Sequence, residues 1–379
     1  MSRSNLRVLS IFGTRPEAVK MAPVIKRLSK TPGVNSLVCV TAQHREMLDQ
    51  VLDLFRIVTD YDLNLMRHDQ SLAELTASVF TDLDAVIRRT KPDWILAQGD
   101  TTTVMAAALL AYYNKVQVGH VEAGLRTDDK WQPYPEEINR RVAGVVADLH
   151  FAPTEWARDN LLAEGIPMKR VVVTGNPVID ALYWVIEQPY DLYQGPLKDV
   201  PEDKRIVLIT AHRRENFGEP LKRVFQALRE IAYRYADDIL MIYPVHLNPN
   251  VYGPAHNMLG DVPNIRLTEP LDYLPMAHLI KRAHLVLTDS GGLQEEAPAL
   301  GTPVLVLRQV TERPEAIQAG TARLVGTDQL RIVGQASILL DNPKEHNAMA
   351  KAVNPFGDGH AAERIVSALL DASRDRSGI

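Results

Sequence analysis

Hydrophobic positions along the chain fall into short apolar runs, and longer stretches with helical periodicity separate these runs. Short β-branched apolar runs are typical of buried strands, whereas apolar residues spaced three or four apart indicate amphipathic helices. Their regular alternation predicts the α/β class, with parallel sheets crossed by helices. The predicted strands cover residues 6–12, 37–41, 94–97, 116–120, 149–152, 171–174, 205–210, 239–245, 264–268, 284–289 and 302–307.

The chain is long enough for two such domains, because its 379 residues exceed what one hydrophobic core usually organises. Residues 189–204 are rich in Pro, Asp, Gly and Tyr and lack apolar periodicity, so we interpret them as a linker. We predict Rossmann-like, doubly wound domains over residues 1–188 and 205–379, facing one another across a cleft. The last helix can pack back on the first domain.

The most informative stretch runs from residue 284 to residue 301. A predicted strand turns through Ser290, Gly291 and Gly292 into a helix. The first N–H groups of a helix have no partners within it and lie at the positive end of its dipole, so a phosphate can bind there. We predict an anion site in which Glu296 accepts hydrogen bonds from ribose hydroxyls. The alternative is a tight turn beside a solvated acid, because a lone glycine loop is a weak signal.

Cations stand at two further helix starts. Residues 13–17 turn the first strand into a helix with proline at its first position, so Arg15 and Lys20 lie near the carboxyl edge of a sheet. Open α/β folds bind ligands at that edge. Arg313 likewise precedes a helix that starts with proline. These cations suit a diphosphate, and the alternative is that they are solvated surface charges.

Three acids fall at strand exits or helix entries, namely Asp100, Glu122 and Glu136. In a doubly wound domain such positions gather on one rim of the sheet. Gathered carboxyl groups raise one another's pKa and supply general acid/base pairs. The alternative treats each acid separately as a helix cap or an ion-pair partner, and Glu136 could form an ordinary i,i+4 pair with Arg140.

A histidine and two arginines follow the strand at residues 205–210. His212, Arg213 and Arg214 suit a departing phosphate, because an imidazolium can donate a proton while arginine takes up charge. The alternative is a structural histidine.

Composition and missing motifs exclude several classes of protein. The formal net charge of -5 leaves no broad basic surface for nucleic acid, and a single cysteine, Cys39, excludes an intrachain disulfide. The sequence has no secretory or membrane-spanning pattern, so we expect a cytoplasmic protein. Neither a dinucleotide fingerprint nor a Walker motif occurs, and the acidic pairs at residues 60–62 and 82–84 do not predict a metal site. The residues alone therefore predict an enzyme acting on a nucleotide-diphosphate sugar, with glycosyl transfer, hydrolysis and epimerisation all open.

Seven motifs, colinear across nearly the whole chain, resemble those of the non-hydrolysing UDP-N-acetylglucosamine 2-epimerases. They are Gly13-Thr14-Arg15-Pro16-Glu17-Ala18, Gly99-Asp100-Thr101-Thr102-Thr103, His120-Val121-Glu122-Ala123-Gly124-Leu125-Arg126, Pro135-Glu136-Glu137, His212-Arg213-Arg214-Glu215, Asp289-Ser290-Gly291-Gly292-x-Gln294-Glu295-Glu296 and Thr311-Glu312-Arg313-Pro314-Glu315. The resemblance implies a glycosyltransferase-B-like fold, a homodimer, and reversible conversion of UDP-GlcNAc to UDP-ManNAc without NAD or metal. In bacteria this reaction would feed surface-polysaccharide synthesis.

The resemblance also implies a role for each matching residue. The acid/base candidates are Asp100, Glu122 and Glu136, and His212 would assist the departing diphosphate, with Arg140 steadying Glu136. The residues implied to hold UDP are Arg15, Lys20, Ser290, Gly291, Gly292, Glu296 and Arg313.

Family members can also bind UDP-GlcNAc as an activator beside the catalytic site. Gln43, Arg213 and His246 match positions of that second site. Glu46 and Asp69 stand where some relatives have glutamine and arginine, and this change of charge could weaken the site.

Three alternatives share parts of this pattern. A hydrolysing relative would release UDP and free ManNAc, and a glycosyltransferase would need an acceptor. A non-catalytic sensor of nucleotide sugars would keep the anion site and lose the acids, all three of which are present here.

Overall fold

The computed structural model describes residues 5–41, 45–65, 70–195 and 198–377, with side chains outside the description at 45–47 and 375–377. Its contacts divide the chain into two units. Unit 1 comprises Met1–Ala181 and Phe356–Ile379, and unit 2 comprises Leu182–Pro355. The chain therefore passes from unit 1 to unit 2 inside helix α7 (Pro177–Ile186) and returns just before Phe356. This division comes a few residues before residue 188, where the sequence pattern divides the chain, and it places residues 356–379 in unit 1.

Unit 1 is built on a parallel sheet whose described strands follow the order β3-β2-β1-β4-β5-β6-β7. The strands are β1 (Leu6–Phe12), β2 (Val34–Val40), β3 (Tyr61–Asp62), β4 (Trp94–Gln98), β5 (Gln117–Val121), β6 (Leu149–Ala152) and β7 (Val171–Val173). Besides α7, the helices are α1 (Arg15–Ser29), α2 (Arg45–Phe55), α3 (Leu72–Thr90), α4 (Thr102–Tyr113), α5 (Glu136–Val146), α6 (Glu155–Ala163) and α15 (Ala361–Ser377), with a 3-10 turn at Met168–Arg170.

Unit 2 repeats this architecture with a parallel sheet in the order β10-β9-β8-β11-β12-β13. Its strands are β8 (Arg205–Thr210), β9 (Ile239–Pro244), β10 (Ile265–Thr268), β11 (Ala283–Thr288), β12 (Val304–Val306) and β13 (Ala322–Leu324). Its helices are α8 (Glu219–Arg234), α9 (Pro249–Leu259), α10 (Tyr273–Arg282), α11 (Leu293–Ala299), α12 (Pro314–Gln318), α13 (Gln329–Asp341) and α14 (Pro343–Ala350), with a 3-10 turn at Arg214–Asn216. The predicted α/β class, with two doubly wound parallel sheets, is confirmed.

Each sheet contains one point at which the strand order reverses direction. In unit 1 this switch point lies between β1 and β4, and in unit 2 it lies between β8 and β11. Ligands of doubly wound sheets bind outside the carboxyl ends of the strands at such a point, because the crossover helices on its two sides lie on opposite faces. The loops after these four strands are therefore where chemistry is expected.

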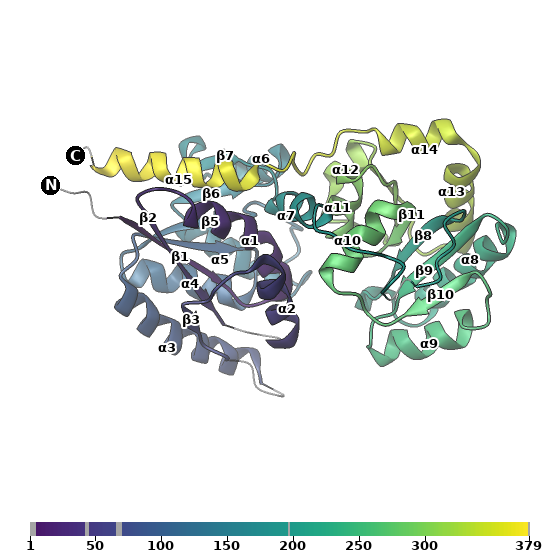
Figure 1. The fold of residues 1–379 in the computed structure, drawn as a ribbon. Helices are drawn as coiled ribbons and strands as arrows, with labels where there is room; N and C mark the ends of the chain where they lie inside the picture. Colours follow the sequence, from purple (N-terminus) through teal and green to yellow (C-terminus); the bar gives the residue numbers. More distant parts are fainter. Residues whose placement is uncertain (1–4, 42–44, 66–69, 196–197, 378–379) are drawn as a thin grey trace. The chain divides into compact units, whose positions relative to one another are not determined.

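Apolar side chains fill both faces of each sheet. Helix α4 is apolar all round, with Ala106, Ala107 and Ala108 fully buried, so it fits between α3 and α5. The C-terminal helix α15, yellow in Figure 1, packs on α1 in unit 1. Trp94 Nε1 of β4 donates a hydrogen bond to Ser373 Oγ of α15 at 2.9 Å, which helps to fix this helix.

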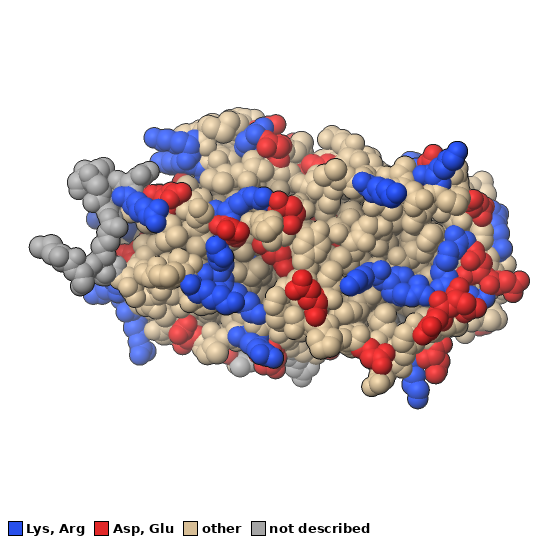
Figure 2. All heavy atoms as spheres, turned by 45° about the horizontal axis from the view of Figure 1, so that its top comes forward, with Lys and Arg blue, Asp and Glu red and all other residues tan. Residues whose placement is uncertain are grey.

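Sequence patterns missed β3 and β13, which are edge strands of two and three residues. Runs this short carry no usable periodicity, and pairing with a longer neighbour decides their conformation. On the face drawn in Figure 2, acidic and basic side chains are interspersed rather than separated. Within the described ranges, no helix is both long and apolar enough to cross a membrane.

Candidate active site

Glu122 follows β5, and three hydrogen-bond donors converge on its carboxylate. Lys20 Nζ of α1 lies 2.6 Å from Oε1 and 2.7 Å from Oε2. Asn176 Nδ2 donates to Oε1 at 2.9 Å, and Gln98 Nε2 donates to Oε2. A cation and two amides thus compensate a carboxylate that is only 7% exposed. The backbone of Glu122 has φ 63°. Residues other than glycine rarely adopt this left-handed conformation, and those that do are concentrated at functional sites.

Asp100 follows the neighbouring strand β4 and pairs with Arg140 of α5. Arg140 Nη2 lies 2.5 Å from Asp100 Oδ2, and Asn139 Nδ2 donates to the Asp100 carbonyl at 3.0 Å. Burial raises the pKa of Asp100, the Arg140 charge opposes this rise, and the Glu122 charge adds to it. The two carboxyl groups are therefore close enough for one charge to act on the other, as in acid/base pairs.

Glu136 is the first residue of α5 and is half-buried. Because Arg140 lies on the same helix and contacts Asp100, α5 links Glu136 to the loop after β4. The sequence predicted that Arg140 would steady Glu136. The guanidinium of Arg140 forms ion pairs with Asp100 and, at 3.4 Å, with Glu137 Oε2. A steadying contact between Arg140 and Glu136 stays a prediction.

Glu17 joins the two loops that flank the switch point of unit 1. Its Oε2 accepts hydrogen bonds from the backbone N–H groups of Gly13 at 2.8 Å and Thr14 at 2.7 Å. Its Oε1 accepts from Thr101 Oγ1, in the loop after β4, at 2.6 Å. Burial raises the pKa of Glu17, while these hydrogen bonds act to lower it. The capping box formed with Thr14 also fixes the start of α1 and so places Arg15, its first residue.

Asp289 organises the corresponding edge of unit 2. This carboxylate is fully buried after β11, and its Oδ2 accepts from the backbone N–H groups of His212 and Arg213, each at 2.8 Å, and from Asn216 Nδ2 at 3.2 Å. Its Oδ1 lies 3.7 Å from His212 Nδ1. Burial lowers the pKa of His212, and the Asp289 charge opposes that change. The loops after β8 and β11 are thus held together at the second switch point.

Two residues predicted for an activator site lie beside His212. Arg213 is its chain neighbour, and the imidazole of His246, which follows β9, stacks on the His212 ring with centroids 5.3 Å apart. Asn248 N donates to His246 Nδ1 at 3.0 Å and so orients this ring. Gln43 and Asp69 lie outside the described residues, as does the side chain of Glu46.

Ser290, Gly291 and Gly292 connect β11 to α11 as predicted, and Arg313 lies against them. A Cβ on Gly291 would be 3.4 Å from Arg313 Cζ, so glycine lets the guanidinium approach the backbone closely. Arg313 Nε donates to Glu295 Oε1 at 2.8 Å, which fixes the guanidinium beside the start of α11. Backbone N–H groups and an oriented arginine side chain are the groups that bind phosphate.

Glu296 is one turn further along α11 and is 8% exposed. Tyr273 Oη, at the start of α10, donates to Glu296 Oε1 at 2.7 Å. This contact orients the carboxylate from the side of the neighbouring helix. A hydroxyl-binding role for the second oxygen is compatible with this arrangement and stays a prediction.

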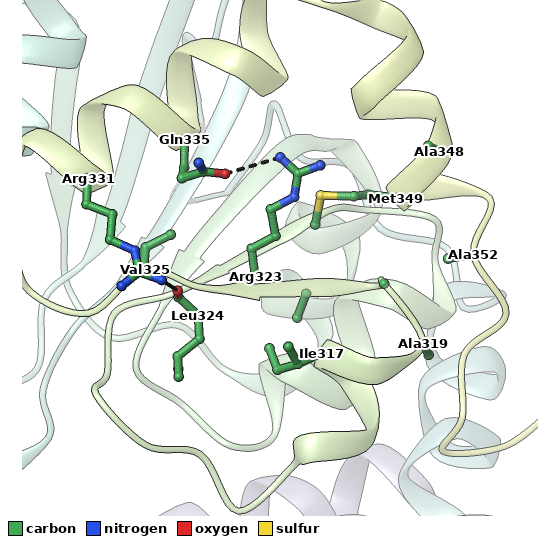
Figure 3. Close-up of a pocket in the computed structure, with 12 residues that line it drawn as sticks. Ile317, Ala319, Arg323, Leu324, Val325, Arg331, Gln335, Ala348, Met349 and Ala352 are labelled. Atoms are coloured by element: carbon green, nitrogen blue, oxygen red, sulfur yellow. Dashed lines mark hydrogen bonds between the residues drawn. The ribbon is translucent and has the colours of Figure 1, made fainter.

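A cavity of about 590 Å³ elsewhere in unit 2 contains none of the predicted residues. It lies along β13, between α12, α13 and α14, and Figure 3 shows that Arg323 bonds Gln335 across it. Arg331, also on its wall, donates to the Leu324 carbonyl at 2.7 Å. The polar groups of these residues are thus used within the fold. Among the described side chains, no group of three or more His, Cys, Asp and Glu residues is placed to hold a metal.

Sequence reasoning assigned no role to three residues that build these sites, although Asp289 begins one of the motifs that it recognised. Gln98 and Asn176 contact Glu122, and Asp289 holds the loop of His212. Each had a usable signal, because each stands at a strand exit beside a glycine or a residue of a recognised motif. Amides at such positions look like turn residues, and only the fold shows which carboxylate they reach.

Comparison with known proteins shows the family of this chain. A family model for UDP-N-acetylglucosamine 2-epimerase matches residues 26–370. The chain is 53% identical over 370 residues to the UDP-N-acetylglucosamine 2-epimerase of Salmonella typhimurium, covering 96% of this chain and 98% of that one. A crystal structure of UDP-GlcNAc 2-epimerase from Neisseria meningitidis bound to UDP-GlcNAc is 49% identical, with a TM-score of 0.90 over 97% of this chain and 100% of that one. The Methanocaldococcus jannaschii enzyme in complex with UDP-GlcNAc and UDP is 34% identical, with a TM-score of 0.82 and coverage of 97% and 100%. This chain belongs to the UDP-N-acetylglucosamine 2-epimerase family.

Proposed function

We propose that the chain interconverts UDP-GlcNAc and UDP-ManNAc by the non-hydrolysing route, with no metal or nicotinamide cofactor. Family membership and relatives solved with UDP-GlcNAc or UDP support the substrate class. The observation that carries the proposal is the pair formed by Asp100 and Glu122. These carboxyl groups leave adjacent strands beside the switch point, interact electrostatically and each contact a cation. Acid/base chemistry at carbon needs such a pair.

The chemistry explains why several acids are needed. The C2 proton lies beside an acetamido group and is not acidic enough for simple removal. In the proposed route a carboxylate takes this proton while the C1–O bond breaks and its electron pair leaves with UDP, which gives 2-acetamidoglucal. UDP then adds back to C1 while an acid delivers a proton to the other face of C2. Two faces require two proton carriers, or one that reaches both.

The proposed proton carriers belong to unit 1, and most of the proposed UDP-binding residues belong to unit 2. Asp100, Glu122 and Glu136 are the proposed proton carriers, and Lys20 is proposed to act through Glu122, which it contacts. UDP would be held mainly by the groups around α11, with Arg313 at the phosphates and Glu296 at the ribose. The full proposed set is Arg15, Lys20, Ser290, Gly291, Gly292, Glu296 and Arg313.

His212 is proposed to assist the departing diphosphate. Burial lowers the pKa of this imidazole and so favours its neutral form in the protein alone. A bound diphosphate would add negative charge beside it and favour the imidazolium form. The ring could then donate a proton to the leaving oxygen when charge develops there.

Three further features belong to the same proposal. We propose a homodimer, activation by UDP-GlcNAc at a site including Gln43, Arg213 and His246, and a role in supplying UDP-ManNAc for surface polysaccharide. The stacking of His246 on His212 offers a direct route from an activator to a catalytic group.

One experiment separates this function from its alternatives. Purified protein is incubated with UDP-GlcNAc in D₂O and followed by NMR. The proposal expects UDP-ManNAc with deuterium at C2 and UDP-GlcNAc that also gains deuterium as equilibrium is reached. Accumulation of free ManNAc and UDP would identify a hydrolysing enzyme. Binding without deuterium exchange would identify a non-catalytic sensor.

A further inference from the structure

Asn176 lies close to the point where the chain passes from unit 1 to unit 2. It stands between β7 and α7, is 1% exposed, and forms no part of the acid/base set. Its Nδ2 donates to Glu122 Oε1 at 2.9 Å, and its Oδ1 accepts from Val178 N at 3.4 Å. Both contacts require the same orientation of the amide, because a carboxylate accepts and an N–H donates.

The backbone of Asn176 belongs to a compact junction, which we define as residues 174–180 and 356–364. The Asn176 N–H donates to the Phe356 carbonyl at 2.6 Å, and Phe356 is the first residue of unit 1 after the chain returns from unit 2. Gly175 and Gly357 let the two backbones touch, since a Cβ on Gly175 would be 3.2 Å from Gly357 Cα. Both glycines have positive φ values, 82° and 136°, which favour glycine.

The remaining contacts of the junction bind its two segments to one another. Asp180 accepts from the N–H groups of Ala361 at 3.1 Å and Ala362 at 2.8 Å, and so caps α15. Arg364 Nη1 donates to the Thr174 carbonyl at 3.1 Å. Of the junction contacts named here, the hydrogen bond from Asn176 Nδ2 to Glu122 Oε1 is the one that reaches the candidate site.

We propose that Asn176 is a positioning residue for Glu122 and that it ties the orientation of this carboxylate to the conformation of the junction. The inference rests on the proposed function, because it assigns Glu122 a role in proton transfer at C2. Asn176 would act through Glu122, to which its amide donates a hydrogen bond. A change in backbone geometry at either chain passage moves the Nδ2 group and, through it, the carboxylate oxygen that must face C2. Hinges of multi-domain enzymes are a few element-terminal residues of this kind.

The first test compares Asn176→Ser with Asp180→Asn. Serine keeps a capping oxygen for α7 and removes the amide donor to Glu122. Asp180→Asn instead weakens the cap of α15 and leaves the backbone contact between Asn176 and Phe356 in place. We expect Asn176→Ser to lower kcat by about 10- to 100-fold, the usual effect of a misplaced catalytic group, with little change in KM. The acidic limb of its kcat–pH profile should move to higher pH, because a carboxylate that loses a donor is protonated more easily. Asp180→Asn should lower Tm and leave kcat and the acidic limb unchanged.

The second test is a double-mutant cycle with Gly357→Ala. A Cβ at this position would lie 3.5 Å from Asn176 N in a backbone conformation that disfavours side chains. We expect Gly357→Ala to reproduce the fall in kcat and the shift of the acidic limb, and to add little in the Asn176→Ser background. Additive effects would overturn the coupling. If Asn176→Ser behaved like Asp180→Asn, the positioning role itself would be overturned. A wild-type protein that does not epimerise UDP-GlcNAc would instead remove the proposed function.

Discussion

Two buried histidines predict that unit 1 loses stability in mild acid. His120 on β5 and His150 on β6 are register partners and are almost completely buried. Burial lowers the pKa of His120 to about 4, and burial, together with the neighbouring His120, lowers the pKa of His150 to about 3. The ring of His120 also lies 2.7 Å, through Nε2, from the carbonyl oxygen of Gly99, which precedes Asp100. Since a carbonyl only accepts, Nε2 carries the proton and the neutral ring holds this turn.

The size of the effect follows from the difference between folded and unfolded pKa values. A histidine in the unfolded chain titrates near pH 6.5. Because both folded values are lower, their contribution to stability is complete above that pH and is lost as the pH falls towards the folded pKa. A pH of about 5 lies roughly 1.5 units below the unfolded pKa, and each unit corresponds to about 1.36 kcal/mol. Each histidine therefore lowers the free energy of unfolding by about 2 kcal/mol at this pH. The pair together costs about 4 kcal/mol, a large share of the 5–15 kcal/mol typical of a domain.

Urea unfolding at about pH 7.5 and about pH 5 measures this cost. Tryptophan fluorescence reports mainly on unit 1, which contains Trp94, Trp131 and Trp156 of the chain's four tryptophans. Other groups also titrate in this range, so the decisive quantity is the difference between wild type and His150→Gln. We expect this variant to lose about 2 kcal/mol of the pH dependence, while the exposed control His256→Gln keeps all of it. Equal pH dependence in wild type and His150→Gln would refute the reasoning.

Three further predictions concern activity and binding. Glu122→Gln should lower kcat by about 10²- to 10⁴-fold and leave the Kd for UDP nearly unchanged by calorimetry, and wild-type turnover would remove this residue from the mechanism. Arg313→Lys keeps the charge and loses the planar fork, so the Kd for UDP should rise by about tenfold or more, and an unchanged Kd would place the phosphates elsewhere. His246→Ala should abolish any acceleration of UDP-ManNAc turnover by added UDP-GlcNAc, whereas His256→Ala should retain it; retained acceleration in both would exclude His246 from an activator site.

The sequence predicted the long elements and the strand exits well, because both depend on local signals. Apolar runs and proline-started helices are readable without tertiary information, and the predicted strand at 205–210 coincides with β8. The boundary between the two units was harder to predict from the sequence. The chain passes into unit 2 within α7, an ordinary helix, and not in the Pro-rich stretch that follows it. Such a division depends on which core each side chain joins, and local composition does not encode this.

Within the site, the structure shows contacts between side chains that the sequence did not predict. Lys20 was expected at a diphosphate, and the structure adds a contact between its ammonium and Glu122, which is 102 residues away in the chain. Arg140 was expected to steady Glu136, and the structure adds an ion pair with Asp100. The two expected roles stay predictions. Long flexible side chains reach several loops, so sheet topology decides which loop is within reach. Strand order was not available from the sequence, and these partners depend on it.

Strand order also explains where the candidate residues lie within each unit. In unit 1 the loops after β4 and β5 carry Asp100 and Glu122, and helix α1, which follows β1, carries Lys20. In unit 2 the loops after β8 and β11 carry His212 and the Ser290–Gly292 turn. Each set flanks a switch point, where crossovers diverge and leave the strand ends open. His246, one of the proposed activator residues, follows β9, which is the strand next to β8 in the sheet of unit 2. Because adjacent parallel strands end at the same edge, the imidazole of His246 can stack on that of His212.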